Sequence, residues 1–197
     1  MLYLEIGASL NTSKRQFATD NTERFGGMRY IYCIFIERME NFTYAHVTLS
    51  KATQEGLLKD ICGRPSIEAC GVLLGHRDDA GNWYVNEVLA LPNIFDSPVY
   101  FEFAPEDLLA VELSYPGQVV GVYHSHPTGF DRASETDYQN MQRINQEQQI
   151  PWVWLIICGP FDETFIERAK GSISQNSIIA YHYYEETGLQ RVGLVMD

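Results

Sequence analysis

Two histidines, a serine and an aspartate stand at a spacing that can bring metal-binding groups together. Residues 118–125 are largely β-branched and apolar, which predicts a strand, and on a strand the imidazoles of His124 and His126 point to the same face. Ser134 then predicts the N-cap of a helix, so Asp137 falls in its first turn. Two imidazoles and one carboxylate with a fourth position open form the ligand set of a catalytic zinc site. A metal hydrolase is therefore the first hypothesis.

An upstream glutamate completes a pattern that resembles a known enzyme family. Glu68 opens the segment Glu-Ala-Cys-Gly-Val-Leu-Leu-Gly, and the downstream motif reads His-Ser-His-Pro, six residues, then Ser-x-x-Asp. This arrangement is similar to that of the JAMM (MPN+, Mov34/PAD-1, JAB domain) zinc metalloproteases, in particular their short bacterial and archaeal members. Every position of the family motif is filled, and the resemblance spans about residues 44–169.

The resemblance implies a role for each of five residues. His124, His126 and Asp137 would bind one zinc ion, and zinc lowers the pKa of bound water from 15.7 to about 7. Glu68 would be the general base, which takes a proton and later passes it to the leaving amine. Ser134 would donate a hydrogen bond to the oxyanion of the tetrahedral intermediate. Its oxygen can accept from the helix backbone at the same time, as a cap.

The same resemblance implies a protein substrate with an extended tail. Members of the family cut after the C-terminal Gly-Gly of a ubiquitin-like or sulfur-carrier protein, at a peptide or an isopeptide bond. Such a tail can lie beside the sheet as an added strand. Residues 93–103 and residues 128–133 both contain aromatic side chains, and we expect these stretches to form the substrate groove.

Other interpretations of the motif are open at this point. A histidine in a strand is usually a satisfied polar residue, and Ser-x-x-Asp before a helix is usually a simple cap. A non-catalytic MPN domain serves as a protein-interaction scaffold, although such relatives have lost motif residues that are intact here. A metallopeptidase that acts on an unrelated small peptide or amide is a further alternative.

The remaining histidines and the cysteines are not expected to take part in chemistry. His46 and His182 have no partner at metal-ligand spacing, and His76 follows a predicted strand as a surface residue. Cys70 lies close to Glu68 but is interpreted as a core thiol. The four cysteines contain no Cys-x-x-Cys spacing, so we expect no disulfide framework and favour a reducing cytoplasm as the location.

Composition limits the class of protein. The 197 residues, 45% of them hydrophobic and 20% charged, suit one domain that buries roughly 70% of its unfolded surface. The net charge of −12 argues against a nucleic-acid partner. No run approaches the ~20 apolar residues of a membrane helix, and no transport signal is visible, so no membrane contact is expected. The sequence leaves the oligomeric state open.

The order of elements predicts a single-domain α/β sandwich with a curved mixed sheet flanked by helices, which resembles the JAB/MPN and cytidine-deaminase-like folds. This domain covers residues 43–197. Residues 1–42 are expected to be an N-terminal extension, either partly disordered or from a mis-assigned start, in which 30–36 can add an edge strand. The expected helices are 50–61, 106–114 and 134–148, and the expected strands are 44–48, 69–76, 83–90, 100–103, 118–125, 152–158, 164–169, 177–184 and 190–195.

Overall fold

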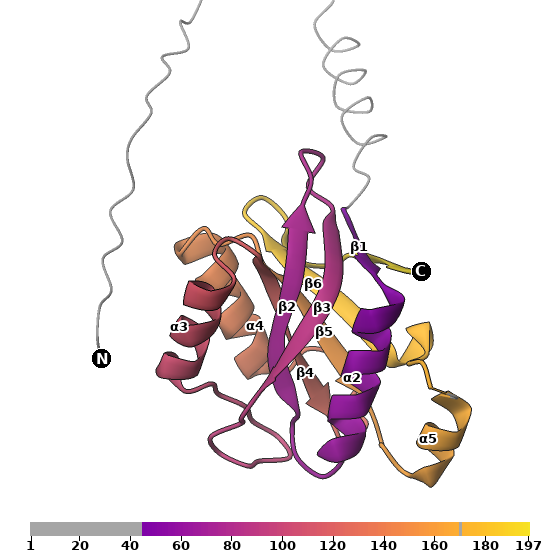
Figure 1. The fold of residues 1–197 in the computed structure, drawn as a ribbon. Coiled ribbons are helices and arrows are strands. Elements are labelled where there is room, and N and C mark those ends of the chain that lie inside the picture. Colours follow the sequence, from indigo (N-terminus) through magenta and orange to yellow (C-terminus); the bar gives the residue numbers. More distant parts are fainter. Residues whose placement is uncertain (1–44, 170) are drawn as a thin grey trace, which may run out of the picture. The chain divides into compact units, whose positions relative to one another are not determined.

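A computed structural model describes residues 45–169 and 171–197, which contain eight strands and four α-helices (Figure 1). The predicted extension over 1–42 and its strand at 30–36 lie outside the described residues. In chain order the elements are β1 (His46–Leu49), α2 (Lys51–Gly63), β2 (Cys70–Arg77), β3 (Trp83–Leu91), α3 (Pro105–Ser114), β4 (Val119–His126), α4 (Glu135–Gln142), β5 (Val153–Cys158), α5 (Glu163–Ala169), β6 (Ile178–Tyr184), β7 (Gly188–Arg191) and β8 (Gly193–Met196).

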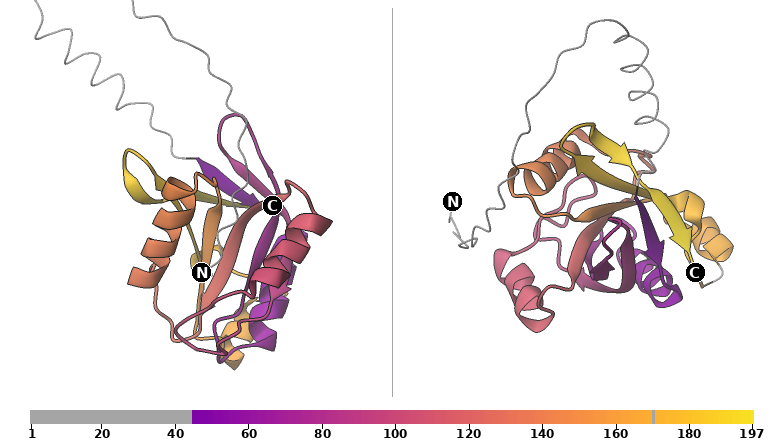
Figure 2. Two further views of the ribbon diagram at one scale, coloured as in Figure 1. Left: turned by 90° about the vertical axis from the view of Figure 1, so that its left-hand side faces the viewer. Right: turned by 90° about the horizontal axis from the view of Figure 1, so that it is seen from above.

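The eight strands form one mixed sheet in the order β7-β6-β5-β4-β2-β3-β1-β8. The pairs β4/β5, β1/β3 and β1/β8 are parallel, and the other pairs are antiparallel. β7 and β8 lie at opposite edges of the sheet although only Val192 separates them, and the Val192 N–H donates to the Ala180 carbonyl at 3.0 Å. The sheet is therefore strongly curved, and one C-terminal segment joins its two edges (Figure 2).

Helices cover both faces of this sheet (Figures 1 and 2). On one face, α2 and α5 bury Leu57, Ile61 and Phe165 against the strands. On the other face, α3 and α4 bury Val111 and Met141. These two layers around a mixed, curved sheet confirm the predicted α/β sandwich. Within the described part of the chain, no helix is long and apolar enough to cross a membrane.

Strand β4 carries side chains to both faces of the sheet. Tyr123 belongs to the core under α2 and α5, whereas Val122 belongs to the core under α3 and α4. The alternation continues to the end of the strand, so His124 and His126 share one face, as predicted, and this is the face of α3 and α4. Both imidazoles are buried there, at 0% and 4% exposed.

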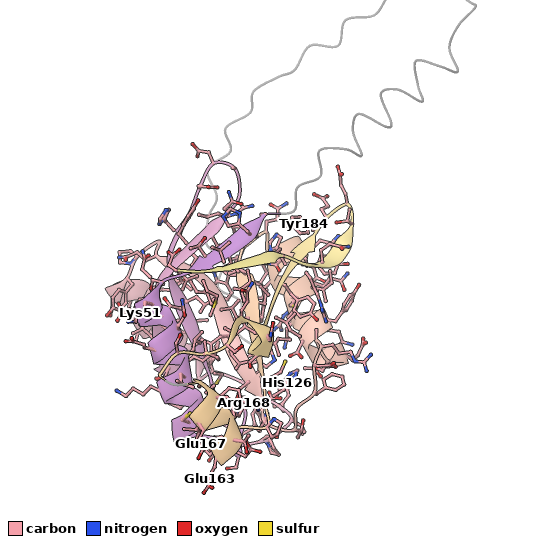
Figure 3. All side chains as sticks on the ribbon, turned by 90° about the vertical axis from the view of Figure 1, so that its right-hand side faces the viewer. Lys51, His126, Glu163, Glu167, Arg168 and Tyr184 are labelled. Carbon is pink, nitrogen blue, oxygen red and sulfur yellow. The ribbon has the colours of Figure 1, made fainter. Side chains whose placement is uncertain are left out.

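Two predicted strands are wrong. Residues 164–169 form helix α5, because the Asp162 side chain accepts a hydrogen bond from the Phe165 N–H at 2.9 Å and caps a turn that buries Phe165 and Ala169 on one side. Figure 3 shows that the polar residues of α5, among them Glu163 and Arg168, project outward. The buried residues Phe165 and Ala169 are four apart, which is the spacing of a helix and not of a strand.

Residues 100–103 form no strand either. They belong to a loop in which the Ile94 N–H donates to the Glu102 carbonyl at 3.1 Å, and the side chains of Phe101 and Phe103 pack on the core under α3. The single strand expected over 190–195 is divided into β7 and β8. The helix expected over 134–148 ends as an α-helix at Gln142 and continues as a π-helical turn over Arg143–Glu147.

Candidate metal centre

The end of β4 fixes the two histidines of the motif. Ser125, between them, points to the opposite face, where its hydroxyl oxygen accepts from the Ala69 N–H at 2.9 Å. The Ser125 N–H in turn donates to the Ala69 carbonyl at 2.8 Å. These two bonds pair Ser125 with Ala69, the residue that follows Glu68. They therefore fix the position of Glu68 relative to His124 and His126.

A capping box places the third residue of the group. The Asp137 N–H donates to the Ser134 hydroxyl oxygen at 3.2 Å, and the Ser134 N–H donates to Oδ2 of Asp137 at 2.7 Å. This reciprocal pair starts α4 and fixes the carboxylate of Asp137 toward the sheet. Asp137 is 5% exposed, so the carboxylate that caps the helix is buried against the two imidazoles.

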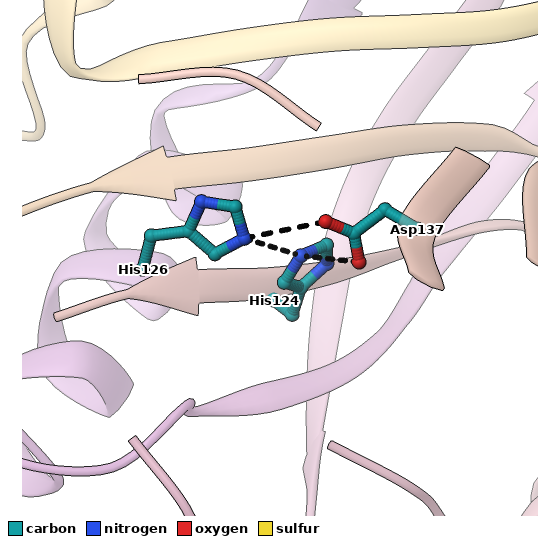
Figure 4. Close-up of side chains that lie close together, drawn as sticks. All are labelled: His124, His126 and Asp137. Atoms are coloured by element: carbon teal, nitrogen blue, oxygen red, sulfur yellow. Dashed lines mark hydrogen bonds and ion pairs between the residues drawn. The ribbon is translucent and has the colours of Figure 1, made fainter. Parts of the chain in front are cut away.

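Three potential ligand atoms converge in this way (Figure 4). Nε2 of His124 lies 3.1 Å from Nε2 of His126 and 3.2 Å from Oδ1 of Asp137, and Nε2 of His126 lies 3.4 Å from Oδ2 of Asp137. A tetrahedral site with metal–ligand bonds of about 2.0–2.1 Å has edges of about 3.3 Å between ligand atoms. The residues present therefore fit a zinc-sized cation with three protein ligands.

Neighbouring groups orient the two imidazoles differently. Nδ1 of His126 donates to the Phe130 carbonyl at 2.9 Å, which leaves Nε2 of that ring unprotonated for a metal. The His124 ring instead stacks on Phe101, with the ring centroids 4.4 Å apart. Nδ1 of His124 is buried and has no hydrogen-bond partner among the described residues. Packing, rather than a hydrogen bond, therefore fixes the His124 ring.

Burial and mutual contact shift the pKa values of these groups. Complete burial lowers the pKa of His124 and keeps its ring neutral. Burial would raise the pKa of Asp137, but the two histidines and Ser134 outweigh it and hold that pKa well below its usual range. Burial would lower the pKa of His126, but hydrogen bonds to Asp137 and to the Phe130 carbonyl raise it. A neutral His124 beside an anionic Asp137 is the protonation state that a cation requires.

Glu68 lies beside this group without belonging to it. Its Oε1 is 3.9 Å from Nε2 of His126, and the side chain is 7% exposed. The backbone is held on both sides, because the Glu68 N–H donates to the Ser97 carbonyl and the Asn93 amide donates to the Glu68 carbonyl at 3.1 Å. Burial, partly offset by His126, raises the pKa of Glu68 to about 7. The carboxyl therefore exchanges a proton near neutral pH, as a general base must.

Ser134 is found at the predicted place with its cap role confirmed. Its hydroxyl hydrogen is donated to Oδ2 of Asp137 at 2.7 Å, while its oxygen accepts from the Asp137 N–H. The predicted bond to an oxyanion would require this hydroxyl to turn away from Asp137. The Ser134 N–H would still hold Oδ2 in that event, so the oxyanion role stays a prediction.

A narrow cleft leads to the group. Glu68, Ser134 and Asp137 line it on one side, and Tyr100, Phe101 and others complete its wall. Its volume is about 10 Å³, roughly that of one water molecule. The cleft therefore has no room for a large side chain next to the converging ligand atoms.

Three residues around the site were not assigned a role from the sequence. Asn93 is buried, and its amide group binds the carbonyls of Glu68 and Tyr100, which shapes the loop that includes Phe101. Phe101 stacks on His124, and Phe130 accepts from His126 through its carbonyl. The predicted groove stretches contain all three, but only the folded backbone shows these individual contacts.

The other candidates take the places expected of structural residues. Cys62, Cys70 and Cys158 are free thiols, and burial raises the pKa of Cys70 to about 12, which makes it unreactive. His76 is exposed and stacks on Tyr84. His182 is buried and donates to the Trp152 carbonyl at 2.9 Å, and neither it nor His46 joins a metal-binding group within residues 45–169 and 171–197.

Fold and site together define an α/β domain with a buried His-His-Asp group that can bind a metal. Residues 50–169 match the family described as prokaryotic homologs of the JAB domain. The matched segment is more than half of the chain and contains Glu68, both histidines and Asp137, and the protein therefore belongs to this family.

One solved structure supports the fold, and a second matches with a lower TM-score. The solution structure of protein DSY2949 from Desulfitobacterium hafniense is similar with a TM-score of 0.55 and 22% identity, over 77% of this chain and 92% of that one. AF2198, a JAB1/MPN domain protein from Archaeoglobus fulgidus, matches with a TM-score of 0.42 and 21% identity, over 75% of this chain and 98% of that one. At such identity the likeness to DSY2949 shows the fold alone. No curated protein matches the sequence.

Proposed function

We propose that this protein is a zinc-dependent peptidase or isopeptidase that cuts after the C-terminal Gly-Gly of a ubiquitin-like or sulfur-carrier protein. The observation that carries the proposal is the convergence of His124, His126 and Asp137, with ligand atoms 3.1–3.4 Å apart, next to a separate buried carboxylate. A scaffold that needed no metal would have no use for three converging ligands and a fourth acidic group held beside them.

Each residue has a separate task in the proposed reaction. A zinc ion in this site supplies Lewis acidity, which makes hydroxide available near neutral pH. Glu68, 3.9 Å from His126 but outside the ligand group, accepts the proton of the attacking water and returns it to the leaving amine. The Ser134 hydroxyl donates to the oxyanion once it turns from Asp137. The Phe130 carbonyl keeps His126 in the tautomer that presents Nε2.

The narrow cleft supports glycine at the bond that is cut. With a volume of about 10 Å³, the cleft leaves no space for a side chain beside Glu68, Ser134 and Asp137, so residues without side chains suit this place best. A protein that ends in Gly-Gly offers such a backbone, and a folded partner can dock outside the cleft. The loops that include Phe95 and Phe130, which are 55% and 41% exposed, are the surfaces proposed to meet it. No nucleic acid or membrane takes part, and the free thiols of Cys62, Cys70 and Cys158 support a cytoplasmic location.

A cleavage assay tests this function. A ubiquitin-like protein is fused through its C-terminal Gly-Gly to a reporter domain and incubated with zinc-loaded protein, and products are measured by mass spectrometry. We expect a single cut after Gly-Gly, and Glu68→Gln should lower the rate by about 100-fold or more while zinc stays bound. Equal cleavage of unrelated peptides would favour the small-peptide alternative. A folded protein without zinc or cleavage would favour the scaffold.

A further inference from the structure

A second, larger cavity lies next to the narrow cleft. It has a volume of about 370 Å³ and opens between the 100–105 segment, α3, α4 and the adjoining strands. Cavities of about 300–1,000 Å³ hold small ligands or large side chains. The 370 Å³ cavity shares Tyr100, Phe101 and Asn140 with the narrow cleft, so the two spaces are neighbours separated by a common wall.

Phe101 is the part of this wall that links the cavity to the metal centre. The centroid of its ring lies 4.4 Å from that of His124 and 5.5 Å from that of Phe103. Phe103 also lines the cavity. An extended chain advances about 3.3 Å per residue. A chain with its scissile bond at the metal centre therefore reaches the cavity within a few residues.

The lining of the cavity is aromatic and aliphatic. Its apolar members include Tyr100, Phe101, Phe103, Leu108, Trp152 and Trp154. A bound aromatic ring would gain edge-to-face or stacked contacts with these rings in addition to burial of its area. Most of the cavity is therefore suited to a large apolar side chain.

The polar side chains around the cavity are already paired with one another. Nη2 of Arg143 donates to Oδ1 of Asn140 at 3.1 Å, and the Tyr100 hydroxyl donates to Glu102 at 2.9 Å. Nε1 of Trp154 donates to the Asn145 side chain at 3.1 Å. An incoming ligand is thus not needed to satisfy these groups.

We propose that this cavity is a specificity pocket for an aromatic side chain of the substrate tail, one or two residues before the two glycines. The inference rests on the proposed function, since the narrow cleft is assigned to the glycines and the adjoining cavity then receives the residue that precedes them. The substrate class is accordingly a Gly-Gly tail preceded by Phe, Tyr or Trp. An alanine at that place leaves the cavity unfilled, and an aspartate buries a charge in it.

Peptide binding and peptide cleavage test the pocket separately. Fluorescein-labelled peptides ending in Phe-Gly-Gly, Phe-Ala-Gly-Gly, Ala-Ala-Gly-Gly and Asp-Ala-Gly-Gly are titrated against zinc-loaded Glu68→Gln protein, and the same sequences joined to a fluorogenic amine are given to active protein. We expect at least one Phe peptide to bind about tenfold tighter than the Ala peptide, the effect of burying one large apolar side chain. Its kcat/KM should rise by a similar factor. Equal affinity of all four peptides would overturn the proposal.

Two neighbouring leucines provide the matched variants. Leu108 lines the cavity, whereas Leu109 is 52% exposed on the same helix and lies outside the lining. Leu108→Trp fills the cavity and should abolish the preference for Phe over Ala, while Leu109→Trp keeps it. Loss of the preference in both variants would contradict a pocket at this place. A Phe preference in binding without any cleavage would uphold the pocket and reject the proposed hydrolysis.

Discussion

The two faces of the sheet use their polar side chains in different ways. On the face of α2, the guanidinium of Arg64 donates to Asp60, to the Leu91 carbonyl and to the Cys70 carbonyl, and Asp60 also accepts from Tyr123. Each of these groups has a partner of complementary type. The network therefore fastens α2 to β2, β3 and β4 and leaves nothing for a ligand.

On the face of α4, the buried polar groups point their potential metal-binding atoms at one another. The two Nε2 atoms are 3.1 Å apart and face both oxygens of Asp137, and the buried Nδ1 of His124 has no partner among the described residues. Acceptor groups gathered in this way are costly unless a cation lies among them. The contrast separates a network that stabilises the fold from a group arranged for chemistry.

Alanine substitutions of two N-cap serines, one on each face, test this comparison with the largest expected effect. Ser50 caps α2 by accepting from the Thr53 N–H at 3.1 Å, as Ser134 caps α4. Either change to alanine should cost about 1 kcal/mol in the free energy of unfolding. Ser134→Ala should also lower kcat by about 100-fold, since it removes the proposed oxyanion donor. Urea unfolding and cleavage kinetics measure both effects. A kcat in Ser134→Ala equal to that of Ser50→Ala would reject the oxyanion role.

Breaking the Arg64 network should lower stability but not metal binding. Arg64→Met leaves Asp60 and two backbone carbonyls without their donor, so we expect a loss of about 3 kcal/mol in the free energy of unfolding. Arg168→Met is the control, because Arg168 is exposed and donates to the Thr164 carbonyl of its own helix. The loss there should stay below about 0.5 kcal/mol. Similar losses in both variants would show that the network contributes little.

The pH dependence of the metal-free protein should report Glu68. Burial raises its pKa from 4.5 to about 7, so the folded state keeps a proton that the unfolded state loses. The contribution of Glu68 to the free energy of unfolding is fully present below about pH 4.5 and is lost as the pH rises to about 7. Glu68→Gln lacks this titrating group. The free energy of unfolding of the variant, relative to that of wild type, should therefore rise by about 2 kcal/mol between these pH values. A constant difference in urea titrations with chelator present would contradict the assignment.

A single hydroxyl offers the mildest change. Tyr123→Phe removes the 2.8 Å bond from the Tyr123 hydroxyl to Asp60 while the ring stays in the core. We expect a loss of about 1–2 kcal/mol in the free energy of unfolding, with zinc content unchanged. Thermal unfolding and metal analysis of the same sample check both statements. A loss of zinc in this variant would mean that the two faces are coupled through β4.

The sequence predicted those parts of the site that depend on local spacing. His124 and His126 share a face because strand side chains alternate, and Ser134 positions Asp137 because a capping box is a local structure. Glu68 came from the family resemblance, since its approach to His126 depends on the pairing of β2 with β4. The convergence of the three ligands bears out the expected group, while zinc itself is still a proposal.

The sequence did not predict features that depend on distant contacts. The β-branched and aromatic run Thr164-Phe165-Ile166 favours a strand, but the cap at Asp162 and burial of Phe165 give a helix. The loop at 100–103 has strand-like residues, yet Asn93 binds its backbone and turns Phe101 onto His124. Nor does a local pattern reveal that β7 and β8 lie at opposite edges of the sheet.

Zinc content is the measurement that tests the proposed metal centre most directly. Purified wild type, His126→Ala and His76→Ala are loaded with zinc, desalted and analysed for metal, with circular dichroism as a check of folding. His76 is a matched control because it is an exposed histidine that stacks on Tyr84. We expect one zinc per chain in wild type and in His76→Ala, and none in His126→Ala. A folded wild-type protein without zinc, or zinc retained in His126→Ala, would contradict the proposed centre.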